Sequence, residues 1–216
     1  MEVIEDDAAD PRVVRTRQRL RTAVLAAAAE RPIEQVSVSD LAKAAEINRA
    51  TFYKHAGSPA DLLRMVLIQD YDARHAAFVA AVQTPGSRLP DVWRQALSAL
   101  AAHLDQHAAI YEANLVGGRG HALAPLMARH ITMTVEWLLT ARPQLLPADT
   151  PRDGLTVRAT SHYMGYGALG IAAAWLQEPT PRDPDRFTAT VLTLLPHWIL
   201  GGEPDGAAPA RPAADR

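Results

Sequence analysis

Signals that begin a helix recur along the sequence, with apolar stripes of helical period between them. Ser58-Pro59-Ala60-Asp61 places a capping hydroxyl, a proline and an acid in the order typical of a helix N-terminus, and Thr150-Pro151 and Asp183-Pro184 repeat the pattern. Between these signals apolar residues recur at i, i+3, i+4 and i+7, and no segment sustains the two-residue alternation of a half-buried strand. The sequence therefore predicts an all-α fold of about nine helices.

The predicted helices end where proline or glycine follows the apolar stripe. We expect them at residues 15–31, 38–45, 49–55, 59–84, 90–105, 106–116, 121–141, 151–177 and 184–198, with a kink at Pro196 in the last one. Residues 159–177 carry no formal charge, but their histidine, tyrosines and glutamine make them too polar for a membrane span. A helix buried on all sides in a soluble protein is the expected explanation.

The charges divide the chain into three parts. Residues 1–10 carry five acids and no base, residues 11–57 carry nine lysines and arginines against four acids, and residues 58–216 carry thirteen against fifteen. A basic block of about fifty residues beside a mildly acidic body favours a head that binds a polyanion. Arginine-rich helices that are simply solvated are the alternative.

Several classes of protein are excluded or disfavoured. The chain has no cysteine, which excludes disulfides, cysteine-ligated metal sites and a thiol nucleophile. Residues 1–10 are acidic where a targeting peptide would be basic, so we expect a cytoplasmic location. The sequence contains no G-x-S-x-G motif, phosphate-binding loop or dinucleotide-binding glycine pattern, so we expect no enzyme and no cofactor.

The most informative stretch is residues 36–63, VSVSDLAKAAEINRATFYKHAGSPADLL. It predicts two short amphipathic helices joined by a tight turn at Glu46-Ile47, the spacing of a helix-turn-helix. The second helix buries Ile47 and Phe52 and presents a guanidinium, a methyl and a hydroxyl, groups that reach base edges in a major groove. The residues expected to contact DNA here are Arg49, Ala50 and Thr51 at base edges and Tyr53, Lys54 and His55 at phosphates.

The run from residue 15 to residue 63 also resembles the N-terminal domain of TetR-type bacterial transcriptional regulators. It has the family's arginine-led first helix, its "V-x-D-L-A-x-x-A" turn segment and its "R-x-T-F-Y-x-H" run. The resemblance implies base contacts from Ser39 as well, and DNA contacts from Arg15 and Arg17 of the first helix. Three positions depart from the family pattern: Glu46 replaces a glycine, Ala56 an aromatic residue and Pro59 a lysine.

The resemblance also implies the organisation and role of the chain. It implies a homodimer that binds double-stranded DNA at a near-palindromic operator, acts as a repressor and is released by a small apolar effector. A TetR-like helical sensor with weak or no specific DNA binding is the alternative, and an all-α enzyme is a more remote one. The expected divisions are a disordered acidic tail at 1–11, a helix-turn-helix domain at 12–57, a ligand-binding and dimerisation domain at 58–200 and a disordered tail at 201–216.

The 151–177 helix has two apolar faces, one with Tyr163 and Tyr166 and the other with Met164 and Trp175. A dimer would cover one face while the other lines the protomer interior, although the pattern does not decide between the faces. A large monomeric core is the alternative. The residues expected at the dimer interface are Met164, Ala168, Ile171, Trp175, Phe187, Val191, Leu194 and Trp198.

Polar and aromatic side chains on inward helix faces suggest an apolar effector pocket with a few polar groups. The residues expected to line it are Trp93, His103, Tyr111, Asn114, Met127, His130, Trp137, Tyr163 and Tyr166. Each inward histidine is alternatively a hydrogen-bonded core residue. His103 and His107 have the i, i+4 spacing of a metal-binding pair, but no third ligand is evident in the sequence, so we expect no metal site.

Overall fold

The computed structural model describes residues 10–115 and 123–201, and helices are the only regular elements within those ranges. The all-α prediction is therefore confirmed. The α-helices are α1 (Pro11–Glu30), α2 (Val38–Ala44), α3 (Arg49–Tyr53), α4 (Pro59–Gln83), α5 (Leu89–Gln106), α6 (Ala108–Asn114), α7 (Ala124–Ala141), α8 (Gly154–Leu176) and α9 (Pro184–Leu194). Short 3₁₀ helices follow α1, α7 and α9 at η1 (Ile33–Gln35), η2 (Pro143–Leu145) and η3 (His197–Leu200).

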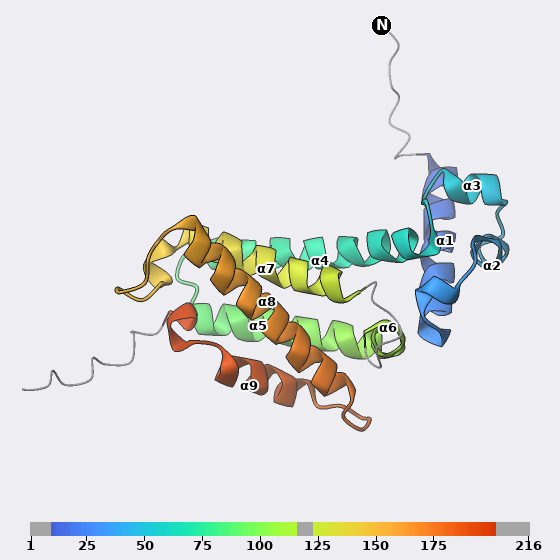
Figure 1. Cartoon of the computed structure of the whole chain (residues 1–216). Helices are drawn as coiled ribbons and strands as arrows, with labels where there is room; N and C mark the ends of the chain where they lie inside the picture. The colour runs from blue at the N-terminus through green and yellow to red at the C-terminus, as the bar shows by residue number, and fades with distance from the viewer. Residues whose placement is uncertain (1–9, 116–122, 202–216) are drawn as a thin grey trace, which may run out of the picture.

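Helices α1 to α3 form a head at one end of α4, and the remaining helices form an elongated body along it (Figure 1). α4 has 25 residues, a length of about 37 Å, so it reaches from the head deep into the body. It packs on α1 near the head and on α5 and α7 in the body. α4 therefore connects the head to the body.

The apolar core does not stop at the boundary between head and body. One cluster of buried residues runs from Leu20 and Phe52 in the head through Leu67 on α4 to Trp175 and Phe187 in the body. A second cluster occupies the far end of the body. The predicted domain boundary between residues 57 and 58 lies between α3 and α4. The apolar core is continuous across this boundary.

The close crossing of α7 and α8 depends on one glycine. A Cβ atom at Gly165 would collide with the Thr132 hydroxyl and the Ala128 carbonyl oxygen of α7. Gly167 and Gly170 have open space where a Cβ would lie. Of Gly165, Gly167 and Gly170, only Gly165 is needed for the close contact with α7.

Several helix ends differ from the sequence prediction, and three of the larger differences follow from a local cap or proline. α1 begins at Pro11, because the Asp10 carboxylate accepts a hydrogen bond of 2.8 Å from the Arg12 amide. α8 begins at Gly154, because the Asp153 side chain caps it. α9 ends at Leu194 without a kink, because residue 195 precedes a proline and takes an extended conformation.

α3 ends at Tyr53 rather than at residue 55, and α6 begins at Ala108 rather than at residue 106. The predicted helix ends at residues 116 and 121, and most of the two predicted tails, lie outside the described residues. Among the helices that are described, none is both long enough and apolar enough to cross a membrane. The expectation that residues 159–177 are buried on all sides is wrong for the single chain, because α8 exposes one face along its length.

The turn between α2 and α3 contains the one non-glycine residue with positive φ in the described chain. Glu46 has a φ of 53°, and its carboxylate lies 3.3 Å from the Arg19 guanidinium. Both side chains are largely exposed, so this ion pair contributes little free energy. The left-handed conformation costs a residue with a Cβ about 1–2 kcal/mol.

We expect Glu46→Gly to be more stable than Glu46→Ala by about 1 kcal/mol in free energy of unfolding, because glycine removes the backbone strain. Both variants lose the ion pair to Arg19, so the alanine variant is the matched control. Chemical denaturation followed by circular dichroism measures the difference. Equal stability of the two variants would show that this turn is not strained.

Candidate functional site

Side-chain caps fix both helices of the helix-turn-helix. Ser37 and Asp40 form a capping box at α2, in which the Asp40 amide donates to the Ser37 hydroxyl at 3.1 Å. Hydrogen bonds from Ser37 lower the pKa of the Asp40 carboxyl. The Asn48 side chain caps α3 by accepting a bond of 2.7 Å from the Thr51 amide. The turn closes with a bond of 2.9 Å from the Ile47 amide to the Ala42 carbonyl oxygen.

The head buries one side of this unit and exposes the other. Leu41, Phe52 and Ala56 pack in the same core cluster as Leu20 and Val24 of α1. The predicted DNA contacts lie in the head, seven of them exposed and two, Thr51 and His55, half-buried. The exposed seven are Arg15, Arg17, Ser39, Arg49, Ala50, Tyr53 and Lys54.

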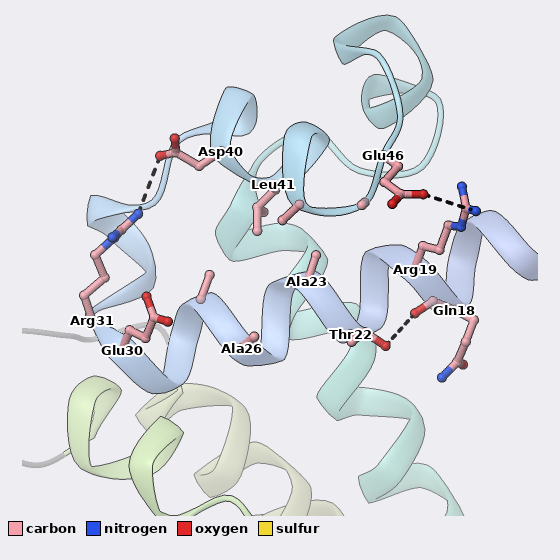
Figure 2. A pocket seen from close by; sticks show the side chains of 13 residues that line it. Gln18, Arg19, Thr22, Ala23, Ala26, Glu30, Arg31, Asp40, Leu41 and Glu46 are labelled. Atoms are coloured by element: carbon pink, nitrogen blue, oxygen red, sulfur yellow. Dashed lines mark hydrogen bonds and ion pairs between the residues drawn. The ribbon is translucent and has the colours of Figure 1, made fainter.

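A groove of about 550 Å³ separates α1 from α2, a feature that the sequence analysis did not anticipate. Figure 2 shows its alanine-rich floor, with Ala23 and Ala26 on α1, and the charged side chains around it. Ion pairs span it near both ends, Arg19 with Glu46 at 3.3 Å and Arg31 with Asp40 at 3.5 Å. These pairs join α1 to α2 and to the turn that follows it.

A smaller cavity of about 80 Å³ lies within the body. Its walls come from α4, α5, α7, α8 and α9, and they are mainly apolar, with Arg74, His130 and Thr134 as polar members. Among the predicted pocket residues, Trp93 and His130 line it. Burial, followed by the charge of His75, lowers the pKa of His130 to about 4, so this ring is neutral at pH 7.

A buried hydrogen-bonded chain stands beside this cavity and contains two more of the predicted pocket residues. The hydroxyl oxygens of Tyr71 and Tyr111 are 2.6 Å apart, and the Tyr111 hydroxyl lies 2.7 Å from Nε2 of His103. Burial raises the pKa of both tyrosines and lowers that of His103 to about 3. Tyr71 stacks on His130 with ring centroids 4.8 Å apart, so the chain touches the cavity wall through that ring.

Three further residues expected in the pocket lie elsewhere. Asn114 is fully buried at the junction of α1 and α6, where its amide group bonds three backbone groups. Met127 packs in the core cluster shared by head and body. Trp137 is half-buried edge-on to His75 and Phe78, beside a separate surface groove. Inward-facing stripes do not by themselves indicate which core residues border an empty space.

The two faces of α8 are exchanged relative to the prediction. Tyr163 and Tyr166 were expected inside but are 76% and 59% exposed, whereas Met164 and Trp175 are buried in the protomer. The reason is the crossing at Gly165, which turns the Met164 side of α8 towards α7.

The expected dimer residues on α9 are mostly interior as well. Phe187 and Val191 are buried in the protomer core, while Leu194 is 65% exposed. The remaining members of the predicted interface, Ala168, Ile171 and Trp198, are half-buried. An apolar surface is nevertheless present on α8, and its exposed members are Leu155, Ala159, Tyr163, Tyr166, Gly167, Gly170 and Ala174.

In the structure Asp70 lies beside His103 and His107, the pair for which the sequence showed no third metal ligand. One ligand atom each from Asp70, His103 and His107 lie within 4.8 Å of one another. Asp70 is on α4, 33 positions before His103, and local spacing could not reveal the approach. Its carboxylate also pairs with Arg21 of α1 at 3.0 Å.

Residues 21–66 match the family model for bacterial regulatory proteins of the tetR family. The chain carries a TetR-family DNA-binding domain. The matched segment runs from α1 through the helix-turn-helix into α4. It contains the α2–turn–α3 unit whose caps and exposed basic face are described above.

Solved structures similar to this chain extend the likeness to the body. The fatty acid degradation regulator FadR from Bacillus halodurans has a TM-score of 0.62 at 15% identity, covering 86% of this chain and 98% of that one. FadR from Thermus thermophilus, a TetR-family repressor in complex with lauroyl-CoA, has 0.60 at 18%, covering 90% and 98%. RolR in complex with resorcinol has 0.55 at 18%, covering 88% and 94%. At these identities the likeness shows the fold, and no curated protein matches the sequence significantly.

The three departures from the TetR pattern are accommodated in the structure. Glu46 adopts the left-handed conformation that glycine would take. Ala56 is 7% exposed and remains part of the core. Pro59 occupies the first turn of α4 behind the cap Ser58, whose hydroxyl accepts a bond of 3.1 Å from the Asp61 amide.

Proposed function

We propose that this TetR-family chain is a DNA-binding transcriptional regulator that acts as a homodimer and represses from a near-palindromic operator until a small effector releases it. The observation that carries the proposal is the joining of two surfaces through α4: a capped helix-turn-helix with an exposed basic face, and a body with an uncovered apolar face on α8. The proposal includes no enzymatic activity.

The uncovered face of α8 supports the homodimer. Leu155, Tyr163 and Tyr166 project from one side of this helix, and Leu194 is exposed on the neighbouring α9. A contiguous apolar surface of this kind is costly in water, and two-fold pairing covers it with its own copy. The open space at Gly167 and Gly170 would let a partner helix approach closely.

Two-fold symmetry then determines the form of the DNA site. Each protomer would insert α3 into a major groove, with Arg49, Ala50 and Thr51 at base edges and Tyr53, Lys54 and His55 near phosphates. The two recognition helices of a dimer read half-sites about 34 Å apart, or a multiple of that distance. The operator would therefore be near-palindromic.

The cavity in the body supports control by a small effector. Its volume of about 80 Å³ is only about half that of the engineered 150 Å³ cavity that accepts benzene. A ligand must therefore enlarge the cavity by displacing the helices that line it, among them α4 with Arg74 and Phe78. Because α4 holds the head, displacement would change the spacing of the recognition helices.

The small volume favours a single aromatic ring over a long acyl chain. RolR was solved in complex with resorcinol, and the FadR of Thermus thermophilus in complex with lauroyl-CoA. A ring with hydroxyl or carboxylate groups would place them towards Arg74, His130 and Thr134, the polar members of the wall.

Arg49→Ala and Lys54→Ala are expected to weaken DNA binding differently. Arg49→Ala should cost about 1–3 kcal/mol at the preferred sequence and relax the preference at one position of each half-site. Lys54→Ala should weaken all sequences alike and lower the salt slope by about one per subunit contact. Selection from a random DNA pool, followed by titrations at several salt concentrations, measures both effects.

The matched control for these variants is Arg94→Ala, which removes an exposed arginine from the body. It should leave both the affinity and the salt slope near the wild-type values. No selective enrichment by the wild-type chain would contradict sequence-specific binding. Unchanged base preference in Arg49→Ala would contradict the role of that residue.

Tyr163→Arg is expected to convert the dimer to a monomer. The substitution would bury two like charges, one arginine from each protomer, in an apolar interface. Sedimentation of the full chain measures the oligomeric state. Met133→Arg changes an exposed apolar residue on α7 and should remain dimeric. A monomeric wild-type chain, or a dimeric Tyr163→Arg variant, would contradict the proposed interface.

Resorcinol and related phenols and aromatic acids are expected to raise the melting temperature and to lower operator affinity. Ala96→Leu, which fills the cavity, should abolish both effects, whereas Ala102→Leu on the exposed side of α5 should not. By linkage, the effector must bind the DNA-bound form less tightly, typically by about 1–3 kcal/mol. The absence of any saturable effect across such compounds would indicate a constitutive DNA binder.

A further inference from the structure

The cluster of Asp70, His103 and His107 lies where three helices meet. Asp70 comes from the middle of α4, His103 from the last turn of α5, and His107 from the junction of α5 with α6. The two imidazole rings are one helical turn apart with centroids 4.8 Å from each other. His103 is buried and the other two residues are half-buried, so the cluster sits at the edge of the core.

We propose that these three side chains form a binding site for a divalent first-row transition-metal ion, with Zn²⁺ as the best match. Two imidazoles and one carboxylate are a donor set suited to zinc and its neighbours and unlike the all-oxygen sets of Mg²⁺ or Ca²⁺. Three protein ligands leave a fourth position for water or an external ligand.

The present separations are close to those that coordination requires. Tetrahedral zinc with ligand distances near 2.0–2.1 Å places its donor atoms roughly 3.4 Å apart. The donor atoms of the cluster lie within 4.8 Å of one another, so they must approach by about 1.4 Å or less. Rotation of the half-buried Asp70 and His107 side chains supplies this movement, while His103 stays fixed in the core.

An outer-shell partner for one ligand is already in place. Metal-bound histidines give one ring nitrogen to the ion and the other to a hydrogen-bonding neighbour, which orients the ring. The Tyr111 hydroxyl lies 2.7 Å from Nε2 of His103 and is itself bonded to Tyr71. This buried chain holds the His103 ring rigidly.

The ion would compete with the head for the same carboxylate. Both oxygens of Asp70 accept hydrogen bonds from Nη2 of Arg21, at 3.1 and 3.0 Å, and this contact ties α1 to α4. Arg74 donates to the Asp70 backbone oxygen at 2.7 Å and adds a further positive charge nearby. Coordination through one oxygen of Asp70 would take that oxygen from Arg21, so metal binding is expected to weaken this tie between head and body.

The test uses the untagged full-length chain after removal of metal with a chelator. Zn²⁺ is titrated in competition with a chromophoric chelator, and Co²⁺ is added separately to record the visible spectrum of a tetrahedral site. We expect one ion per chain. His107→Gln and Asp70→Asn should each weaken Zn²⁺ binding about tenfold or more, because each removes a direct ligand.

Arg21→Ala is the most discriminating variant, because it alone should strengthen Zn²⁺ binding. It removes the guanidinium that now bonds the Asp70 carboxylate. His162→Gln, which changes an exposed histidine of α8, is the matched control and should leave the affinity unchanged. Circular dichroism of each variant verifies that the helical fold is retained. This readout needs no DNA, so it is independent of the proposed regulatory function.

Two results would overturn the proposal. One is the absence of stoichiometric Zn²⁺ binding by the wild-type chain. The other is binding that persists unchanged in both His107→Gln and Asp70→Asn, which would place the ion elsewhere. Unchanged or weaker binding by Arg21→Ala would overturn the competition between the ion and the head.

Discussion

The side-chain amide of Asn114 fixes the position of the head on the body. It is fully buried, accepts a bond of 2.9 Å from the Ile33 amide and donates to the carbonyl oxygens of Ala28 and Ile110 at 3.0 and 2.8 Å. Ala28 is near the end of α1, where carbonyl groups lack helical partners. An apolar side chain at this position would leave several buried backbone groups unpaired, at about 1–3 kcal/mol each. The exposed ion pairs around the groove of the head add little by comparison.

One segment of α4 contacts both the head and the cavity in the body. Asp70 and Arg74 are one helical turn apart, the first tied to α1 through Arg21 and the second facing the cavity in the body. The apolar core continues past both, so neither the cavity nor the cluster around Asp70 is isolated from the head. A ligand at either place acts on the same helix. Under the proposed function, displacement of α4 by a ligand would be passed to the head, which carries α3.

The sequence predicted the head well because its determinants are local. Caps such as Ser37 and Asn48, and the spacing of buried residues such as Phe52, lie within a few positions of the helices they specify. The body was less predictable because its determinants are distant in sequence. Both faces of α8 are apolar, and which one turns inward depends on the approach of Thr132 to Gly165 from another helix. Likewise, no local pattern could place Asp70 beside His103.

The electrostatics of the interior restrict what the cavity can accept. His130 is neutral, since burial lowers its pKa to about 4, and Arg74 is the only charged residue among the described ones that line the cavity. One nitrogen of Arg74, Nη1, is committed to the Asp70 backbone oxygen, while its buried Nε has no hydrogen-bond partner. A buried donor without a partner costs free energy that an incoming acceptor recovers. A hydrocarbon would leave that donor unpaired, whereas a ring bearing a hydroxyl or carboxylate oxygen would satisfy it. This argument favours, within the proposed function, an oxygen-bearing aromatic effector over a purely apolar one.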